Sequence, residues 1–149
     1  MITIRRTNSE DKNFLDLVVE LDKDLAKRNG ATNDFFAQFN KTDLIKNVVV
    51  ALKDNIPVGC GAMKPYNQST MEIKRMYVLP EMRGKGIAVA VLQALEAWAG
   101  ELGYNKCILE TGDKMPEALR LYQKTGYQVI PNYGPYENVA SSICFKKNL

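Results

Sequence analysis

Residues 83–88 read Arg-Gly-Lys-Gly-Ile-Ala and form a glycine-rich corner between two segments of different periodicity. The run Met76–Val78 before the corner is apolar and strand-like, and the segment after it has apolar residues at helical spacing. Two glycines let the backbone turn sharply and let a ligand approach the main chain closely. The free amides of the following helix, with Arg83 and Lys85 beside them, suit a phosphate group. The sequence therefore predicts a strand, a tight turn and a helix that together bind a phosphorylated cofactor.

The spacing within the corner separates it from two common phosphate motifs. A P-loop ends in Gly-Lys-Ser/Thr, but Gly86 and Ile87 follow Lys85, so no hydroxyl is available for magnesium. The dinucleotide-binding pattern fits Gly84 and Gly86, but it requires a small residue where Val89 stands. A nicotinamide-dependent enzyme is thus a competing interpretation, which predicts binding of NAD. A plain basic turn between a strand and a helix is another.

The composition of the chain excludes several kinds of functional site. The 149 residues carry a net charge of +3 and fit a single domain, 1–149, that is large enough to bury its own core. Histidine is absent, which excludes catalytic triads that use it and removes the commonest metal ligand. The basic residues are dispersed and show no recognition motif, so we expect no nucleic acid partner.

Three cysteines lie far apart, each in an apolar run that reads as a strand: Cys60, Cys107 and Cys144. An odd number without CxxC spacing argues against a disulfide framework and against a zinc site. We therefore expect buried, reduced thiols and no metal.

The amino-terminal residues 1–6 alternate like a strand and lack the apolar core of a signal peptide. No apolar run is long enough to span a bilayer. We therefore expect a cytoplasmic protein without a membrane partner.

Apolar periodicity predicts the order of the elements. The expected strands are 2–6, 48–52, 58–63, 71–79, 107–109, 127–130 and 141–146. A helix capped by Asn8 or Ser9 should end near Gly30, and further helices are expected at 33–46, 86–102 and 116–124. Alternating strands and helices of this kind predict a mixed α/β sheet with helices on both faces. The unit 71–110 should be a parallel crossover between the fourth and fifth strands.

Three stretches of the chain resemble the GNAT superfamily of acyl-CoA-dependent N-acetyltransferases. They are Glu72–Val78, Arg83–Ala88 in the pattern Arg-x-x-Gly-x-Ala, and Glu117–Tyr127, which contains Leu-Tyr-x-Lys-x-Gly-aromatic. Val78 lies five positions before Arg83, as the pantetheine-binding strand of this family requires. The predicted order of elements is also that of the family, so the resemblance covers nearly the whole chain. It implies a mostly antiparallel sheet of about seven strands with one parallel pair.

The resemblance implies acetyl-CoA as the cofactor, held in a gap between residues 74–79 and 107–111. Main-chain groups of the strand would pair with the pantetheine arm, and the amides of the corner would hold the pyrophosphate. Met115 stands where many members have a polar residue that contacts this arm. The cofactor-binding residues implied in this way are Met76, Tyr77, Val78, Arg83, Gly84, Lys85, Gly86, Ile87, Ala88, Met115 and Lys124.

The same resemblance implies direct transfer of the acetyl group to a primary amine in a ternary complex. Glu72 would accept the proton of the ammonium, directly or through water. Tyr122 would donate a proton to the leaving thiolate, because its ordinary pKa keeps the hydroxyl protonated at neutral pH. The oxyanion donor would be the backbone amide of Val78 or a neighbour.

The acceptor is expected to be a small-molecule amine, an amino-acid-like compound or a protein amino group. Aromatic and amide side chains fall where the family binds its acceptors: Phe35, Phe36, Phe39, Asn40, Tyr133 and Tyr136. The alternative to an enzyme is a non-catalytic module that senses acyl-CoA. A homodimer formed through the terminal strands is one option for assembly.

Overall fold

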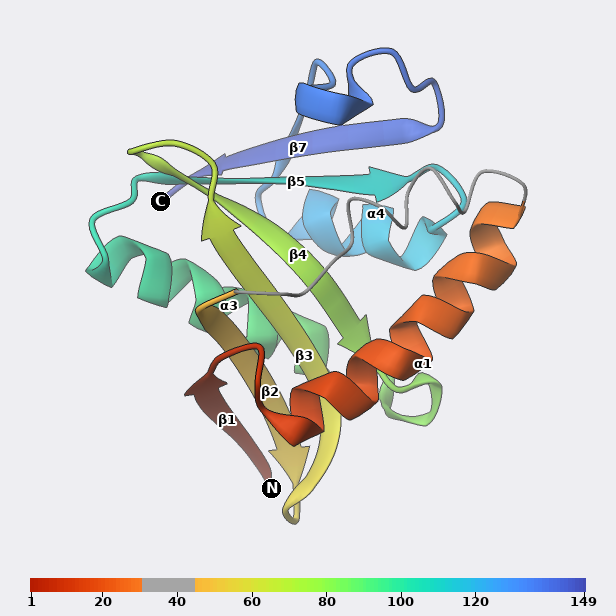
Figure 1. Ribbon diagram of the computed structural model, residues 1–149, viewed down its shortest axis with the longest axis vertical. Coiled ribbons are helices and arrows are strands. Elements are labelled where there is room, and N and C mark those ends of the chain that lie inside the picture. Colours follow the sequence, from red (N-terminus) through yellow and green to blue (C-terminus); the bar gives the residue numbers. More distant parts are fainter. Residues whose placement is uncertain (31–44) are drawn as a thin grey trace.

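A computed structural model describes residues 1–30 and 45–149, and in this part of the chain the strands form one seven-stranded sheet in the order β1-β2-β3-β4-β5-β7-β6 (Figure 1). Neighbouring strands are antiparallel except for the parallel pair of β4 and β5, as the resemblance implies. The strands are β1 (Ile2–Thr7), β2 (Asn47–Lys53), β3 (Ile56–Pro65), β4 (Thr70–Val78), β5 (Lys106–Gly112), β6 (Gln128–Ile130) and β7 (Ser142–Asn148).

Three α-helices of the described residues flank the sheet: α1 (Lys12–Asn29), α3 (Ile87–Glu101) and α4 (Pro116–Lys124). Short 3-10 turns follow β4 and precede β7, namely η2 (Pro80–Met82) and η3 (Gly134–Tyr136). None of these helices is long and apolar enough to cross a membrane. The helix expected at 33–46 falls almost entirely outside the described residues.

The start of α1 differs from the prediction. Its N-cap is Asp11, whose side chain accepts hydrogen bonds from the amides of Asn13 and Phe14. Asn8 instead accepts from the amide of Glu10 and closes the preceding turn. Asp11 takes the capping role because it stands three residues before Phe14, where its carboxylate reaches the free amides of the first turn. The predicted end at Gly30 is confirmed.

The sheet separates two cores, with α1 in front of it and α3 behind it in Figure 1. On the α1 face, Phe14, Leu17 and Leu21 pack against alternate residues of β2 and β3. On the other face, α3 and Tyr122 of α4 pack against Ile73 of β4 and the remaining core residues. All three cysteines are buried and free, as predicted. Leu102, at the end of the helix expected at 86–102, is 49% exposed because the helix ends one residue before it.

A β-bulge interrupts the pairing of β3 with β4. Cys60 pairs with Tyr77 and Ala62 with Lys74, so two residues of β4 lie opposite the single residue Gly61. One of these two, Arg75, has a φ of 59°. A bulge bends its strand and redirects side chains, and such irregularities are frequent beside active sites.

Gly61 is expected to be required for this packing. A Cβ added there would lie 2.6 Å from Met76 Sδ and 2.9 Å from side-chain atoms of Leu95 and Val91. The variant Gly61→Ala should therefore lose about 1–3 kcal/mol of unfolding free energy, measured by urea titration. Gly112→Ala is the matched strand control, because the nearest atom to its Cβ lies at 3.9 Å. Equal midpoints for the two variants would contradict this account.

Candidate active site

The parallel strands β4 and β5 diverge toward their carboxyl ends (Figure 1). Their pairing stops at Glu72 and Ile108, although β4 continues to Val78 and β5 to Gly112. The gap predicted between residues 74–79 and 107–111 is therefore present, but it begins after Ile108. Ligands of such sheets bind at the carboxyl ends of parallel strands, which is where these two separate.

A cavity of about 450 Å³ occupies the region beside this gap. It extends from the glycine-rich corner, past the end of β4, to α4. Its lining includes Tyr122 and ten of the residues predicted to bind the cofactor. Those ten are Met76, Tyr77, Val78, Arg83, Gly84, Gly86, Ile87, Ala88, Met115 and Lys124. Lys85 is exposed and is not part of the lining.

The corner has the backbone conformation that its glycines allow. Gly84 and Gly86 have φ values of 77° and 81°, a region that favours glycine, and Gly86 is the N-cap of α3. Gly86, Ile87 and Ala88 line the cavity, so the free amides of the first helical turn lie beside it. The Arg83 Nε donates to the carbonyl of Val78 at 3.0 Å, so this side chain also ties the corner to β4.

Gly86→Ala should raise the KM for acetyl-CoA about tenfold, because a positive φ costs an L-residue about 1–2 kcal/mol and the corner would relax. Gly100→Ala in α3 is the matched control, since a Cβ has open space at both positions and only Gly86 has a positive φ. Steady-state kinetics with varied acetyl-CoA checks the expectation. An unchanged KM for Gly86→Ala would show that the corner does not position the cofactor.

Tyr122 lies between the cofactor cavity and the core. Its ring packs against Tyr127 and Phe145 at centroid distances of 5.6 and 5.8 Å, and it lines the cavity. Burial, with a smaller effect from the carboxylate of Glu110, raises the pKa of its hydroxyl well above the usual range. The hydroxyl is therefore protonated at any physiological pH and can act as a proton donor.

A second, smaller cavity of about 110 Å³ adjoins the first. Its lining includes Lys74, Arg75 and Glu110, the last of which the sequence interpretation overlooked. The two cavities share Leu21, Met76, Met115, Ala118 and Tyr122. They meet at Met76, within the gap where the resemblance places acetyl-CoA.

Glu110 is a carboxylate held inside this smaller cavity. Ser142 Oγ donates to its Oε2 at 2.7 Å. Burial raises the pKa of the Glu110 carboxyl, and the Ser142 hydrogen bond and the Lys74 ammonium oppose that rise. The pKa of Lys74 is lowered by burial. A carboxylate with a raised pKa beside a cavity is suited to accept a proton.

Glu72, the base predicted from the resemblance, has a different environment. It is 7% exposed, and its Oε2 accepts a hydrogen bond from Tyr133 OH at 2.8 Å. Burial and the nearby Glu72 carboxylate raise the pKa of the Tyr133 hydroxyl. Glu72 does not line either of the two cavities described above. Its catalytic role stays a prediction, while the geometry favours Glu110.

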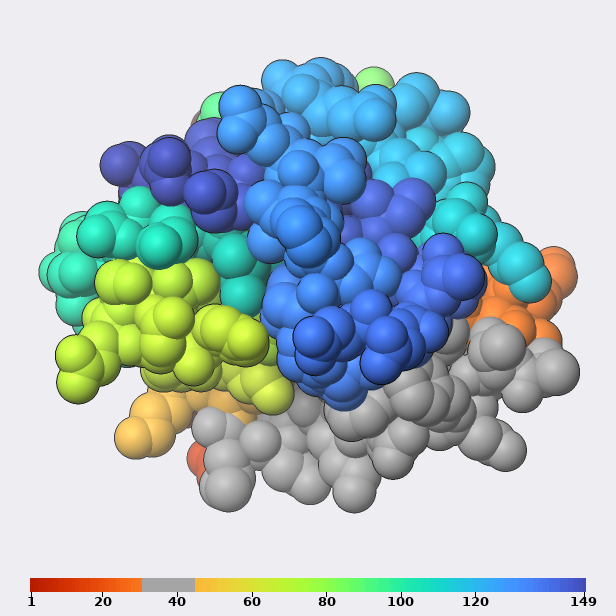
Figure 2. All heavy atoms as spheres, turned by 90° about the horizontal axis from the view of Figure 1, so that it is seen from above, coloured from red at the N-terminus to blue at the C-terminus, as the bar shows by residue number. Residues whose placement is uncertain are grey.

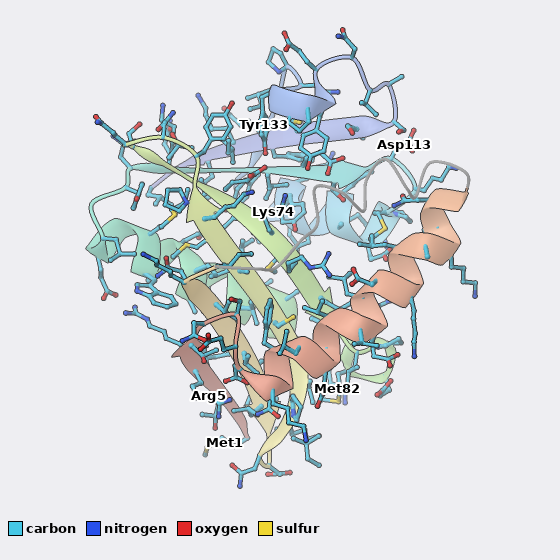
Figure 3. The ribbon with its side chains drawn as sticks, in the orientation of Figure 1. Met1, Arg5, Lys74, Met82, Asp113 and Tyr133 are labelled. Carbon is cyan, nitrogen blue, oxygen red and sulfur yellow. The ribbon has the colours of Figure 1, made fainter. Side chains whose placement is uncertain are left out.

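The predicted acceptor residues divide into two groups. Phe35, Phe36, Phe39 and Asn40 lie outside the described residues. Tyr133 and Tyr136 are packed together, with centroids 5.9 Å apart, and line neither cavity. Tyr133 also contacts Tyr66 at 5.3 Å, and Figure 2 shows the segment around η3 (blue) against the β3–β4 turn (yellow-green). Figure 3 shows Tyr133 above β5 and Lys74, a residue of β4, below it.

Met115 takes part in a contact between α1 and α4. Its sulfur lies 3.3 Å from Arg28 Nη1, and the same guanidinium pairs with Glu117 on α4 and Asp24 on α1. This cluster connects the last turn of α1 to the first turn of α4 beside both cavities. The apolar thioether thus packs against Arg28 at the position where the resemblance implies a polar residue.

Known proteins resemble the chain in sequence and in structure. The acetyltransferase (GNAT) family model matches residues 14–127. An "IAA acetyltransferase" from Azospirillum brasilense is 30% identical and covers 99% of this chain, which spans 98% of that protein. A solved structure from Klebsiella pneumoniae has a TM-score of 0.83 at 27% identity. The match covers 100% of this chain and 98% of the Klebsiella chain. PaiA N-acetyltransferase from Thermoplasma acidophilum, solved in complex with coenzyme A, has a TM-score of 0.75 at 18% identity, with coverages of 100% and 99%.

The chain therefore belongs to the GNAT family of acetyltransferases. It is an acyltransferase, and the fold class predicted from the sequence is confirmed.

Proposed function

We propose that the protein transfers an acetyl group from acetyl-CoA directly to the primary amine of a small molecule in a ternary complex. The observation that carries this proposal is the pair of adjoining cavities. One begins at the glycine-rich corner, the other contains Glu110, and both reach Tyr122. This arrangement would place a phosphorylated cofactor and an amine on opposite sides of the same phenol.

The residues that fit the cofactor are those lining the larger cavity. The amides at the start of α3 suit the pyrophosphate, and Arg120 and Lys124 of α4 add positive charge to the lining. The unpaired edge of β4 beyond Glu72 suits the pantetheine arm. Bound acetyl-CoA supplies the thioester whose acetyl group is transferred.

The chain itself supplies two proton-transfer groups. An alkyl ammonium has a pKa near 10, so the acceptor must lose a proton before it can attack. Glu110 takes that proton, because its buried carboxylate binds a proton more tightly than an exposed one. Tyr122 gives its proton to the sulfur as the C–S bond breaks, and the proton that the attacking nitrogen loses on forming the amide returns to the Tyr122 oxygen, while Glu110 releases its own proton to water.

Direct transfer is favoured over transfer through an acetylated cysteine. Burial raises the pKa of Cys60 and Cys107 to about 12 and that of Cys144 to about 11. The thiolate is the nucleophilic form, so these thiols are poor nucleophiles at neutral pH. None of the three lines either cavity.

A screen of amines with acetyl-CoA, read out as release of free thiol, tests the proposed function. We expect thiol release that depends on a particular class of amine and is accompanied by an N-acetylated product. Tight binding of CoA without turnover on any amine or peptide would instead favour a module that senses acyl-CoA.

A further inference from the structure

Arg75 is a buried cation whose donors are incompletely paired. Its side chain is 1% exposed, and its Nη2 pairs with the carboxylate of Asp22 on α1, a side chain that is 57% exposed. Within the described residues, Nε and Nη1 are buried without a hydrogen-bond partner. Buried donors left unpaired cost folding free energy, and nearly all of them in native proteins are satisfied by protein, water or ligand.

The β-bulge is what turns Arg75 toward α1. Met71 and Ile73 of β4 pack in the α3 core, so regular alternation would send residue 75 to the same face. Instead Arg75 reaches Asp22 on the opposite face, and Met76 packs against the α3 core in its place. The φ of 59° at Arg75 belongs to this rearrangement. This φ is unfavourable for an arginine. The bulge that requires it places the Arg75 guanidinium on the same side of the sheet as the smaller cavity.

Arg75 lines the smaller cavity together with Glu110 and Tyr122. The cavity therefore offers cationic groups, Lys74 and the incompletely paired Arg75, and the buried carboxylate of Glu110 within one space of about 110 Å³. A ligand with one anionic and one amino group would complement both. Because Arg binds carboxylates through charge-assisted hydrogen bonds, the anionic group is best matched by a carboxylate.

We infer that the acceptor is a small amino acid whose carboxylate is bound by Arg75 while its amine lies at Glu110. This inference rests on the proposed function, since it names the class of amine that the smaller cavity takes. Arg75 would then determine specificity, because it holds the acceptor so that its amine points toward Tyr122 and the thioester.

The test compares amino acids with their amides, which keep the amine and the side chain but lack the carboxylate. The pairs are L-alanine and L-alaninamide, and L-leucine and L-leucinamide. For each pair, the ratio of kcat/KM for acid to amide is measured in the native protein and in Arg75→Gln. Dividing one ratio by the other cancels the different basicities of the amines. Arg5→Gln is the matched control, because Arg5 is exposed on β1 and pairs with Asp11.

We expect the acid-to-amide ratio to fall about tenfold or more in Arg75→Gln, which corresponds to about 1.4 kcal/mol, and to be unchanged in Arg5→Gln. Equal ratios in the native protein and Arg75→Gln would overturn the inference, while thiol release would still support the proposed function. Arg75→Lys provides a second variant that keeps the charge and loses most of the fixed donors.

A binding measurement separates this inference from catalysis. Butanoate and butanamide are titrated into the CoA-saturated protein and followed by NMR shifts. We expect butanoate to bind more tightly than butanamide, and Arg75→Gln to lose that difference. If butanoate binds more tightly than butanamide but no amine is acetylated, the proposed function is wrong and the carboxylate site at Arg75 is still supported. Equal binding of the two probes to the native protein would overturn the site.

Discussion

Replacing Tyr122 with phenylalanine is expected to lower kcat about 10²-fold while the protein stays folded. The hydroxyl is the group that protonates the leaving sulfur, so its loss leaves a thiolate to depart unassisted. The ring contacts with Tyr127 and Phe145 are kept in Tyr122→Phe, so thermal unfolding should change little. Thiol release at saturating acetyl-CoA and amine measures the effect.

Tyr127→Phe is the matched control for this variant. Tyr127 packs against the same ring and donates to Glu96 Oε2 at 2.8 Å, but it does not line the cofactor cavity. It should lose some stability and keep its kcat. If Tyr122→Phe turns over as fast as the native protein, Tyr122 is not the acid and its role is limited to packing.

Replacing Glu110 with glutamine is expected to lower kcat by at least about 10²-fold and to change its pH dependence. The base must be ionised to accept a proton, so the native kcat should fall as the pH falls through the pKa of Glu110. This fall of kcat should occur at a higher pH than the ordinary pKa of a glutamate, because burial raises the pKa of Glu110. In Glu110→Gln the fall of kcat at low pH should disappear.

The same pKa shift predicts the sign of the effect on stability. A carboxyl with a raised pKa in the folded state binds its proton more tightly there than in the unfolded chain. Folding therefore loses stability as the pH rises from the unfolded pKa to the folded one. Above that window Glu110 is ionised at a cost, so Glu110→Gln should be at least as stable as the native protein at pH 7. Urea unfolding at pH 4 and pH 7 checks this sign.

Glu72→Gln decides between the two carboxylates. The native Glu72 carboxylate accepts a hydrogen bond from Tyr133 and is not part of the cavity lining. Glu72→Gln should therefore reduce kcat less than Glu110→Gln does. If Glu72→Gln lowers kcat more than Glu110→Gln and also abolishes the fall of kcat at low pH, then Glu72 is the base, as the resemblance implies.

The local features of the cofactor site could be predicted from sequence because they depend on neighbouring residues. The glycines at 84 and 86 adopt positive φ, and α3 begins directly after them. Tyr122 follows from the resemblance to the family, whose pattern lies within a single helix, and the structure places it on the cavity. The corner and the start of the helix are set by short-range periodicity and backbone conformation.

The acceptor side could not be predicted in the same way, because it depends on how strands meet. Glu110 directly follows the strand expected at 107–109, and only the divergence of β5 from β4 brings it to a cavity. Arg75 reads as a residue of regular alternation, and only the bulge opposite Gly61 sends it to the α1 face. Register and divergence are properties of the assembled sheet.

The measurement that tests direct transfer most plainly is the initial-rate pattern with both substrates varied. If acetyl-CoA and the amine occupy the adjoining cavities together, double-reciprocal plots at several amine concentrations must intersect. Parallel lines, joined by an acetylated protein when acetyl-CoA is added without amine, would mean that the acetyl group first passes to the protein, and would contradict the account.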